Sequence, residues 1–472
     1  MNRAAIYSAV AVERRGGVES RLFFDVSGLL QWFAYEAEPT GIQRVSVQLL
    51  REAMRSGKDI ELVARCPGSK SFFSLSPRLV NDLVGETQKE AVQDLRQLFA
   101  RRMRSVHPLL FLREARIGHL PYVLYGLSLE HFVNGKGHSA NYGPLVSRLP
   151  TANDVIVGLG DFWCHPGHAR SLVKLKQETG ASLVHMIHDL FALKHPEWTH
   201  PYYGPEFARQ FALLAPHVDR WLANSSFVEG QISSYTGRHG IERRQIDVVP
   251  MGWDSFPHQA TQLQSQRVLN KYGLTAGSYI LHVGTIEPRK NLQSLIDAMC
   301  RLRNELGDKT PVCVLVGRAG WRANDVQRCL DRTSFAGGKI RWLRDVNDFE
   351  LPSIYRGARF TVMPSLAEGW GLPVQESLAH GVPCIASNAG GLPEAGLDLA
   401  RYINPIDGYD LFSAIRHWTV DDHAVLERRA KIDAHLFSGS LRTTWRDAAQ
   451  TVLRASEAAA LTTAPSELSF SR

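Results

Sequence analysis

The sequence predicts an α/β fold with two domains, each built around a parallel sheet. The chain has 472 residues, which is too long for one ordinary hydrophobic core and fits two domains of roughly 200 residues each. Short apolar runs alternate with segments of helical pattern, as in parallel α/β layers. The alternation restarts at about residue 279, so the second half repeats the architecture of the first.

Ten apolar runs are predicted strands. In the first half they are 22–26, 155–159, 182–187, 220–223 and 247–249. In the second half they are 279–283, 312–316, 340–343, 360–363 and 384–386. Helices are expected between them, for example over 41–56 and 204–215. Because strands buried on both faces read as apolar runs, these segments fit parallel sheets.

The domain boundary is predicted near residue 260, since 253–266 is polar and lacks clear periodicity. We therefore expect a first domain over 1–260 and a second over 261–440. A last helix is expected over 441–461. The Ser/Thr-rich tail 462–472 is predicted to be disordered.

Composition and charge narrow the class of protein. Hydrophobic residues make up 44% and charged residues 21% of the chain, as in globular proteins. No apolar run approaches the roughly 20 residues of a membrane-spanning helix, and the first residues do not read as a signal peptide. The net charge of +7 suits phosphate-bearing partners but is too mild to indicate nucleic acid. None of the six cysteines has Cys-x-x-Cys or zinc spacing, so we expect buried thiols, a reducing compartment and a cytoplasmic protein.

The strongest functional signal is a pair of glutamates, Glu368 and Glu376, which lie on a loop after a strand and in the helix that follows. The glycines between them let the backbone approach a ligand, and its N–H groups can point at anionic oxygens. A carboxylate at Glu376 can accept two ribose hydroxyls. Glu368 can accept a sugar hydroxyl or offset charge that develops in a reaction. The alternative is a solvated helix start with an acidic first turn, but the Gly-Trp-Gly-Leu-Pro context favours a ligand site.

Arg289 and Lys290 form a basic pair before a predicted helix. An ammonium about 4 Å from one charge of a nucleotide diphosphate is worth on the order of 4 kcal/mol at an effective dielectric near 20. The β-phosphate gains charge as the sugar bond breaks, so this stabilisation grows in the transition state. The alternative is a solvated surface pair.

The segment around the two glutamates resembles the Glu-x7-Glu motif of retaining glycosyltransferases of family 4. That family has the GT-B fold, in which two Rossmann-like domains face each other across a cleft. Other segments resemble the family's signatures in the family's order: 25–27, 40–44, 188–190, 224–226, 250–252, 283–292, 315–321, 346–355 and 390–394. The resemblance covers roughly residues 21–455 and leaves the segment 84–150 unmatched as an insertion in the first domain.

The resemblance implies three catalytic residues, Glu368, His188 and Lys290, of which Lys290 is the diphosphate lysine. His188 would lie beside the donor sugar. Its neighbour Asp189 is either its orienting partner or an N-cap for the next turn. A structural histidine is the alternative.

The resemblance also implies that the second domain holds most of the donor and that the last helix crosses back onto the first domain. The donor-binding residues would be Gly41, Gly284, Arg289, Lys290, Val346, Gly371, Leu372 and Glu376. Gly41 follows Thr40, and its N–H would face the diphosphate from the first domain; a plain capped helix start is the alternative. Backbone groups at 345–346 would meet the base. Many relatives have an arginine where this chain has Thr285, and either Arg289 or backbone donors would compensate.

The activity that follows is transfer of a hexose, with retention, from a nucleotide diphosphate sugar. No carboxylate is placed as an obvious covalent nucleophile, so we favour front-face transfer in which the leaving phosphate helps to deprotonate the acceptor. The chain has no Asp-x-Asp, the usual carboxylate pair for a divalent ion, so neither a metal nor another cofactor is expected. The acceptor would be a glycan or a lipid-linked oligosaccharide of bacterial surface polysaccharide, such as lipopolysaccharide, where mannose and rhamnose are frequent.

Two other classes of protein share features of this sequence. A dehydrogenase also has Rossmann-like strands, but the Gly-x-Gly-x-x-Gly fingerprint after the first strand is absent around Gly28. The second alternative is a sugar-binding protein that has lost catalysis. The presence of Glu368, Glu376 and Lys290 argues against it. A donor-hydrolysis assay separates these cases.

The insertion contains a basic and apolar segment, 96–116, with six arginines and one glutamate. Leucines, phenylalanines and a methionine alternate with these charges, and Pro108 divides the segment. Such a composition fits a segment that lies in a membrane interface, here the inner face of the cytoplasmic membrane. The alternatives are a basic helix packed on the first domain and a binding site for an acceptor's phosphates.

Overall fold

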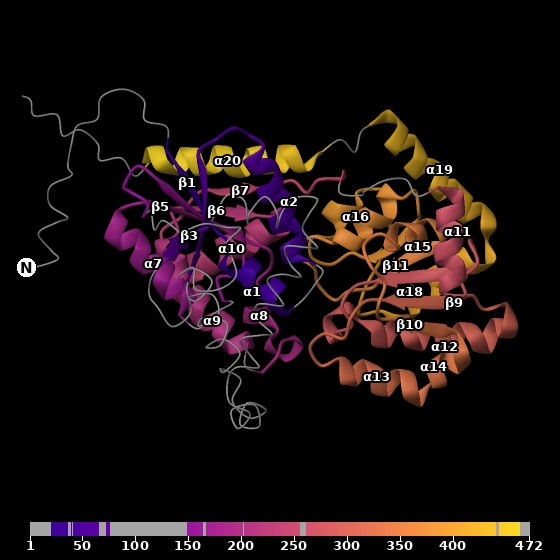
Figure 1. The fold of residues 1–472 in the computed structure, drawn as a ribbon. Helices are drawn as coiled ribbons and strands as arrows, with labels where there is room; N and C mark the ends of the chain where they lie inside the picture. The colour runs from indigo at the N-terminus through magenta and orange to yellow at the C-terminus, as the bar shows by residue number, and fades with distance from the viewer. Residues whose placement is uncertain are drawn as a thin grey trace, which may run out of the picture.

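The computed structural model describes residues 20–35, 39, 41–65, 72–75, 149–163, 167–201, 203–254, 261–439 and 443–462. Two α/β domains lie side by side (Figure 1). The first has a seven-stranded sheet in the order β3-β2-β1-β4-β5-β6-β7, and the second a six-stranded sheet in the order β10-β9-β8-β11-β12-β13. All neighbouring strands pair in parallel except β2 and β3. The predicted pair of parallel sheets is confirmed.

The first domain places its helices between these strands. Its strands are β1 (Leu22–Asp25), β2 (Ile60–Arg65), β3 (Phe72–Ser74), β4 (Val155–Gly158), β5 (Ser182–Ile187), β6 (Arg220–Ala223) and β7 (Ile246–Val248). Its helices include α1 (Ser27–Tyr35), α2 (Ile42–Met54), α7 (His168–Thr179), α8 (Phe191–Lys194), α9 (Tyr203–Leu214) and α10 (Ser226–Arg238). Every residue of β4 and β5 is buried, as expected for central strands covered on both faces.

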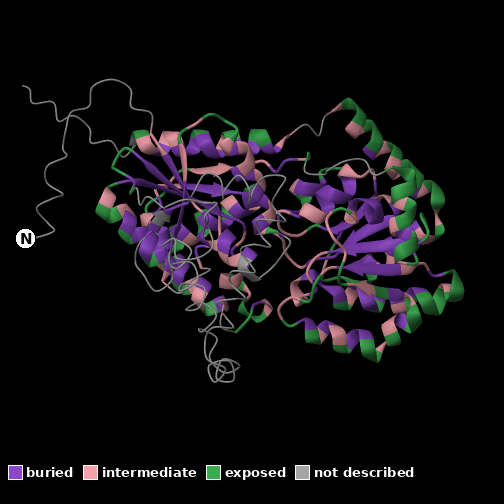
Figure 2. Ribbon diagram, viewed as in Figure 1, coloured by how far each residue is buried: buried purple, intermediate pink, exposed green. Residues whose placement is uncertain are grey.

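The second domain repeats this plan. Its strands are β8 (Tyr279–Val283), β9 (Val312–Val316), β10 (Ile340–Leu343), β11 (Phe360–Met363), β12 (Cys384–Ser387) and β13 (Arg401–Ile403). Its helices include α11 (Gln262–Lys271), α12 (Leu292–Leu306), α13 (Ala323–Arg332), α15 (Leu351–Gly357), α16 (Leu372–Ala379), α17 (Leu392–Gly396), α18 (Gly408–Val420) and α19 (Asp422–Ser438). The short 3₁₀ helix η4 (Pro288–Lys290) precedes α12. Strands are buried and the outer helix faces are exposed in both domains (Figure 2).

The last helix, α20 (Trp445–Thr462), packs against the first domain although the second domain precedes it in the chain (Figure 1). It lies against α2 and against β4, β5 and β6. Trp445, Ala448 and Val452 belong to the same buried cluster as Phe24 and Val157. This helix therefore joins residues 445–462 to the first domain.

The predicted linker 253–266 is wrong in its second half, because α11 begins at Gln262. Thr261 and Gln264 form a capping box, in which each side chain bonds the other's backbone N–H. Only Leu269 of α11 is buried, so the helix carries little apolar periodicity. Residues 84–148 of the predicted insertion and 463–472 of the predicted tail lie outside the described residues. No helix in the described part of the chain has the length and apolar character needed to cross a membrane.

Candidate active site

The candidate site lies where the carboxyl ends of strands from both sheets approach each other. In parallel α/β sheets, ligands bind beyond these strand ends. His188 directly follows β5, Gly284 follows β8, and the loop with Glu368 follows β11. The fold thereby brings together residues that are far apart in the sequence.

Glu368 forms a buried ion cluster with two cations of its own domain. Its Oε1 lies 2.6 Å from Lys290 Nζ, and its Oε2 lies 2.6 Å from Arg289 Nη1. Arg289 also pairs with Glu287 at 2.7 Å and donates to the Ala367 carbonyl. Burial alone would raise the pKa of Glu368, but the charges of Arg289 and Lys290 lower it to about 2. Glu368 is therefore ionised at any physiological pH and holds both cations in place.

Glycines allow the loops around this cluster to approach closely. Gly284 has φ 152°, and a Cβ there would lie 3.4 Å from Lys290 Cε. The Gly390–Gly391 turn packs against the backbone of Glu368, and the Gly391 N–H donates to the Glu368 carbonyl at 2.8 Å. A Cβ on Gly390 would lie 2.2 Å from that carbonyl oxygen. A side chain at Gly390 would therefore displace the backbone of Glu368, whereas one at Gly284 would strain the backbone of the loop because of its positive φ.

Glu376 has partners on both domains. Its Oε1 lies 2.7 Å from Arg44 Nη1 of α2, and its Oε2 accepts a hydrogen bond of 2.8 Å from the Tyr355 hydroxyl. The second arm of Arg44 pairs with Asp348 at 2.8 Å. Burial raises the pKa of Glu376, and the Arg44 charge offsets only part of that effect. Arg44 of the first domain thus forms an ion pair with Glu376 of the second domain, the carboxylate predicted to bind ribose.

His188 is buried and neutral. Its Nε2 lies 2.7 Å from the Leu159 carbonyl, which can only accept, so Nε2 carries the hydrogen and Nδ1 the lone pair. Burial lowers the pKa of His188 to about 4. Asp189 is not the N-cap of α8, which is Leu190; its carboxylate accepts from the Phe191 N–H, two residues further on, at 3.4 Å.

The remaining predicted donor residues occupy loop and helix ends. Gly41 is the N-cap of α2 with φ 45°, and Gly371 is the N-cap of α16 with φ 129°. Leu372 begins α16 and packs against the core of the first domain. Val346 follows β10 and packs against the second domain's core.

Further contacts hold the two domains together around the site. The Ser225 hydroxyl donates to the Gly369 carbonyl at 2.6 Å. The carboxylate of Glu394 accepts from the backbone N–H groups of Ser226 and Phe227, at 2.8 and 2.9 Å, and so caps α10 of the first domain. A Cβ on Gly369 would lie 1.8 Å from the His188 carbonyl oxygen. The loop of the second domain therefore rests directly on the end of β5.

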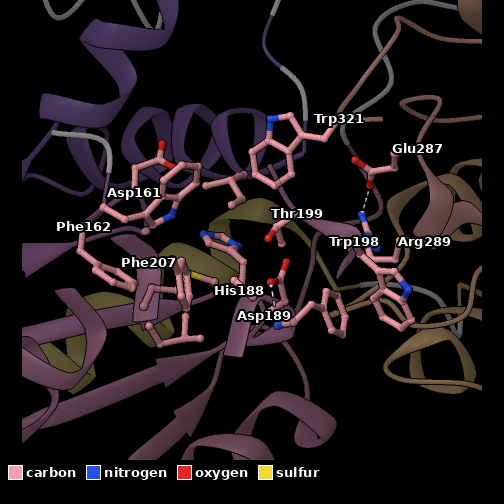
Figure 3. A pocket seen from close by; sticks show the side chains of 17 residues that line it. Asp161, Phe162, His188, Asp189, Trp198, Thr199, Phe207, Glu287, Arg289 and Trp321 are labelled. Atoms are coloured by element: carbon pink, nitrogen blue, oxygen red, sulfur yellow. Dashed lines mark hydrogen bonds and ion pairs between the residues drawn. The ribbon is translucent and has the colours of Figure 1, made fainter. Parts of the chain in front are cut away.

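A cavity of about 160 Å³ adjoins Arg289 (Figure 3). Its polar lining includes Asp161, His188, Asp189 and Glu287. Its aromatic lining is formed by Phe162, Trp163, Phe191, Trp198, Phe207 and Trp321. Within the described ranges, no group of three or more His, Cys, Asp or Glu side chains is arranged to hold a metal ion.

Sequence reasoning named no role for Arg44, Tyr355, Asp348 or Asp161. Arg44 did carry a usable signal. It lies in the first turn of α2, where the helix dipole disfavours a cation. A cation in that place indicates a carboxylate partner outside the helix.

Comparison with known proteins defines the class of this fold. The structure of Anabaena Alr3699/HepE in complex with UDP and glucose matches with a TM-score of 0.58 at 14% identity, over 92% of this chain and 98% of that chain. At this identity the likeness concerns the fold, which is GT-B as predicted. Residues 269–400 match the family described as "Glycosyl transferases group 1". This chain therefore contains a glycosyl transferases group 1 domain, which confirms the resemblance found in the sequence.

Two relatives from Escherichia coli are similar in sequence. "O-antigen chain mannosyltransferase B" is 39% identical over 140 residues, which are 30% of this chain and 36% of the relative. "Serotype-specific mannosyltransferase WbdA" is 25% identical over 444 residues, which are 92% of this chain and 46% of the relative. The chain thus spans less than half the length of either relative.

Proposed function

We propose that this protein is a retaining, metal-independent glycosyltransferase that moves a hexose from a nucleotide diphosphate sugar to a glycan or lipid-linked acceptor. The observation that carries the proposal is the ion cluster of Glu368 with Lys290 and Arg289. It places two cations beside Gly284, in a loop of a group 1 domain. The names of the two relatives, both mannosyltransferases, favour mannose as the sugar and a surface polysaccharide as the product.

The cluster supplies the electrostatics that such a transfer needs. Lys290 and Arg289 would share their charge between Glu368 and the incoming diphosphate. As the bond from the sugar to phosphate breaks, negative charge grows on the leaving phosphate, and two buried cations stabilise that charge. The leaving phosphate would help to deprotonate the acceptor on the same face, and neutral His188 would contact the donor sugar. Glu376 would accept the ribose hydroxyls once Arg44 moves aside or shares the carboxylate.

Thermal-shift screening of nucleotide sugars tests the donor. A bound donor raises the melting temperature, so GDP-mannose should give a larger shift than the other nucleotide sugars of the panel. Lys290→Ala and Glu376→Ala should each weaken nucleotide binding or reduce turnover at least tenfold, about 1.4 kcal/mol. Lys309→Ala and Glu427→Ala, at exposed positions of the same domain, are the matched controls. Unchanged kinetics in both site variants, with the fold intact, would refute the site.

We propose in addition that the segment 96–116 brings the enzyme to a membrane surface. Each Arg near an anionic surface is worth about 1 kcal/mol, so six of them would hold the enzyme near a lipid-linked acceptor. The wild-type protein should sediment with anionic liposomes at low salt and be released at high salt. A variant with Arg101, Arg102 and Arg104 changed to Ser should stay in the supernatant. Equal sedimentation of the two proteins would show that these arginines are not the anchor.

A further inference from the structure

Helix α10 of the first domain begins against the second domain. The first backbone N–H groups of a helix have no partner inside the helix itself. In α10, the Val228 N–H donates to the hydroxyl of Ser225, the N-cap residue, at 3.1 Å. The N–H groups of Ser226 and Phe227 donate instead to the carboxylate of Glu394, at 2.8 and 2.9 Å. Because Glu394 lies in α17 of the second domain, the first turn of α10 is completed by the other domain.

Glu394 is also connected to the backbone of Glu368. The Glu394 N–H donates to the Gly391 carbonyl at 3.1 Å, and the Gly391 N–H donates to the Glu368 carbonyl at 2.8 Å. A Cβ on Gly391 would lie 2.2 Å from the Gly369 carbonyl oxygen, so the turn before α17 packs directly on the residue that follows Glu368. A shift of Glu394 would therefore shift the backbone of Glu368 and Gly369.

The first domain contacts the same loop at a second point, Ser225. This side chain is fully buried, and its hydroxyl donates to the Gly369 carbonyl at 2.6 Å. Gly369 in turn lies against His188, because a Cβ there would lie 1.8 Å from the His188 carbonyl oxygen. The start of α10 thus contacts the Glu368 loop twice, through Ser225 and through Glu394. Both contacts fix where Glu368 lies relative to His188, the residue proposed to contact the donor sugar.

The charge of Glu394 favours its contact with α10. The positive end of a helix dipole attracts a carboxylate, and hydrogen bonds to a carboxylate are stronger than those between neutral groups. The cations that pair with Glu368, Lys290 and Arg289, belong to the same domain as Glu368. They therefore cannot determine where Glu368 lies relative to the first domain, whereas Glu394 can.

We propose that Glu394 is a positioning residue, which bonds the first turn of α10 and so holds the Glu368 loop against His188 in the geometry that sugar transfer needs. The role in transfer rests on the proposed function, whereas the contact with α10 does not. Lys290 and Glu376, the residues proposed to hold the nucleotide, stay in place without Glu394. Loss of the contact should therefore lower the rate of transfer more than the affinity for the donor.

Two substitutions break the contact from opposite sides. Glu394→Ala removes the carboxylate. Ser226→Pro replaces an N–H by a ring carbon at the first position of α10, where proline is favoured. Ser225 before it has φ −161° and ψ 160°, an extended conformation that a following proline allows. Ser226→Ala, which keeps the N–H, is the control for the proline, and Glu427→Ala, at an exposed position of the same domain as Glu394, is the control for the lost carboxylate.

Hydrogen exchange of the backbone amides in the full chain, without any ligand, measures the contact itself. The Phe227 N–H should exchange about tenfold faster or more in Glu394→Ala than in wild type, because its partner is gone. The Val228 N–H, which bonds Ser225, should change by less than about threefold.

Hydrolysis of GDP-mannose measures the consequence, since water takes the mannosyl group and GDP is released. The kcat should fall about tenfold or more in Glu394→Ala and in Ser226→Pro, because small misplacements of reacting groups cost large factors in rate. The double variant should be no slower than either single variant, since all three lose one and the same contact. The KM for the donor should stay within about threefold of the wild-type value, and the shift in melting temperature caused by GDP should be unchanged. Both control variants should behave as wild type.

Three results would each overturn the inference: equal exchange of the Phe227 N–H in wild type and Glu394→Ala, an unchanged kcat, or a raised KM at constant kcat. Additive effects of the two substitutions would overturn it as well, because they would then act through different contacts. Absence of both the GDP shift and GDP release in wild type would instead refute the proposed function.

Discussion

Glu368 and Glu376 belong to one motif but lie in opposite environments. Glu368 has both of its cations, Lys290 and Arg289, on its own domain, and its pKa is lowered to about 2. Glu376 has its cation, Arg44, on the other domain, and burial raises its pKa. The first carboxylate is therefore organised before the domains meet, whereas the second acquires its cation only through their contact. This difference supports the proposal that Glu368 acts in the chemical step and that Glu376 binds the donor.

The largest effect is expected from Glu368→Gln. The amide cannot balance two buried cations, so both lose the partner that holds them beside the diphosphate. Turnover should fall by about 10²–10³-fold, as when a preorganised electrostatic group is removed. Steady-state kinetics at saturating donor provide the measurement, with Glu427→Gln as the control at an exposed site. A decrease below tenfold would show that Glu368 is not part of the chemical step.

A smaller and different effect is expected from Glu376→Gln. The amide still bonds Tyr355 but loses one acceptor for ribose hydroxyls and the attraction to Arg44. The KM for the donor should rise about tenfold while kcat changes by less than about threefold, as when binding is lost equally from ground and transition states. If instead kcat fell and KM stayed constant, the two glutamates would not have the separate roles assigned above.

Arg44→Met tests whether the pairing across the domains tunes Glu376. Removing the guanidinium takes away the charge that lowers the pKa of Glu376, whereas burial and the Asp348 charge that raise it remain. Because an acid loses its charge as the pH falls through its pKa, donor binding should fail at higher pH than in wild type. The KM of the variant relative to wild type should rise from about threefold at pH 8 to about tenfold at pH 6.

The control for this experiment is Arg301→Met on the exposed side of α12, which should leave the pH profile unchanged. A rise in KM that is equal at all pH values would contradict the tuning role. It would show instead that Arg44 contacts the nucleotide directly.

The strands and the glutamate pair could be predicted from the sequence, but the contacts between the two domains could not. All ten predicted strands occur, because continuous apolar runs mark strands buried on both faces. Strands β2, β3 and β13 were missed, since β2 contains Glu61 and Arg65, and β3 and β13 have only three residues each. Glu368 and Lys290 were both named from their local motifs, and the fold joins them.

Arg44 shows why the rest could not be predicted. It meets Glu376 across 332 positions of sequence, and that contact depends on how two separately folded sheets come together. The same holds for Trp321, which meets Trp163 only across the cavity. Local patterns specify elements and their ends, whereas contacts between domains depend on packing that no single segment encodes.

The smallest effect is expected from removing divalent ions, and it tests how the diphosphate is neutralised. Lys290 and Arg289 provide two positive charges at the Glu368 cluster, and the N-termini of α2 and α16 add partial positive charge. These groups can replace the charge that a divalent ion supplies elsewhere. Activity in EDTA should therefore equal activity in Mg²⁺ or Mn²⁺. In Lys290→Ala, added Mg²⁺ should not restore turnover, because the described residues contain no group of three or more His, Cys, Asp or Glu side chains that could hold the ion. Activity lost in EDTA and recovered with either ion would show that Lys290 and Arg289 do not suffice to neutralise the diphosphate. The role given to the Glu368 cluster would then have to include a bound metal ion.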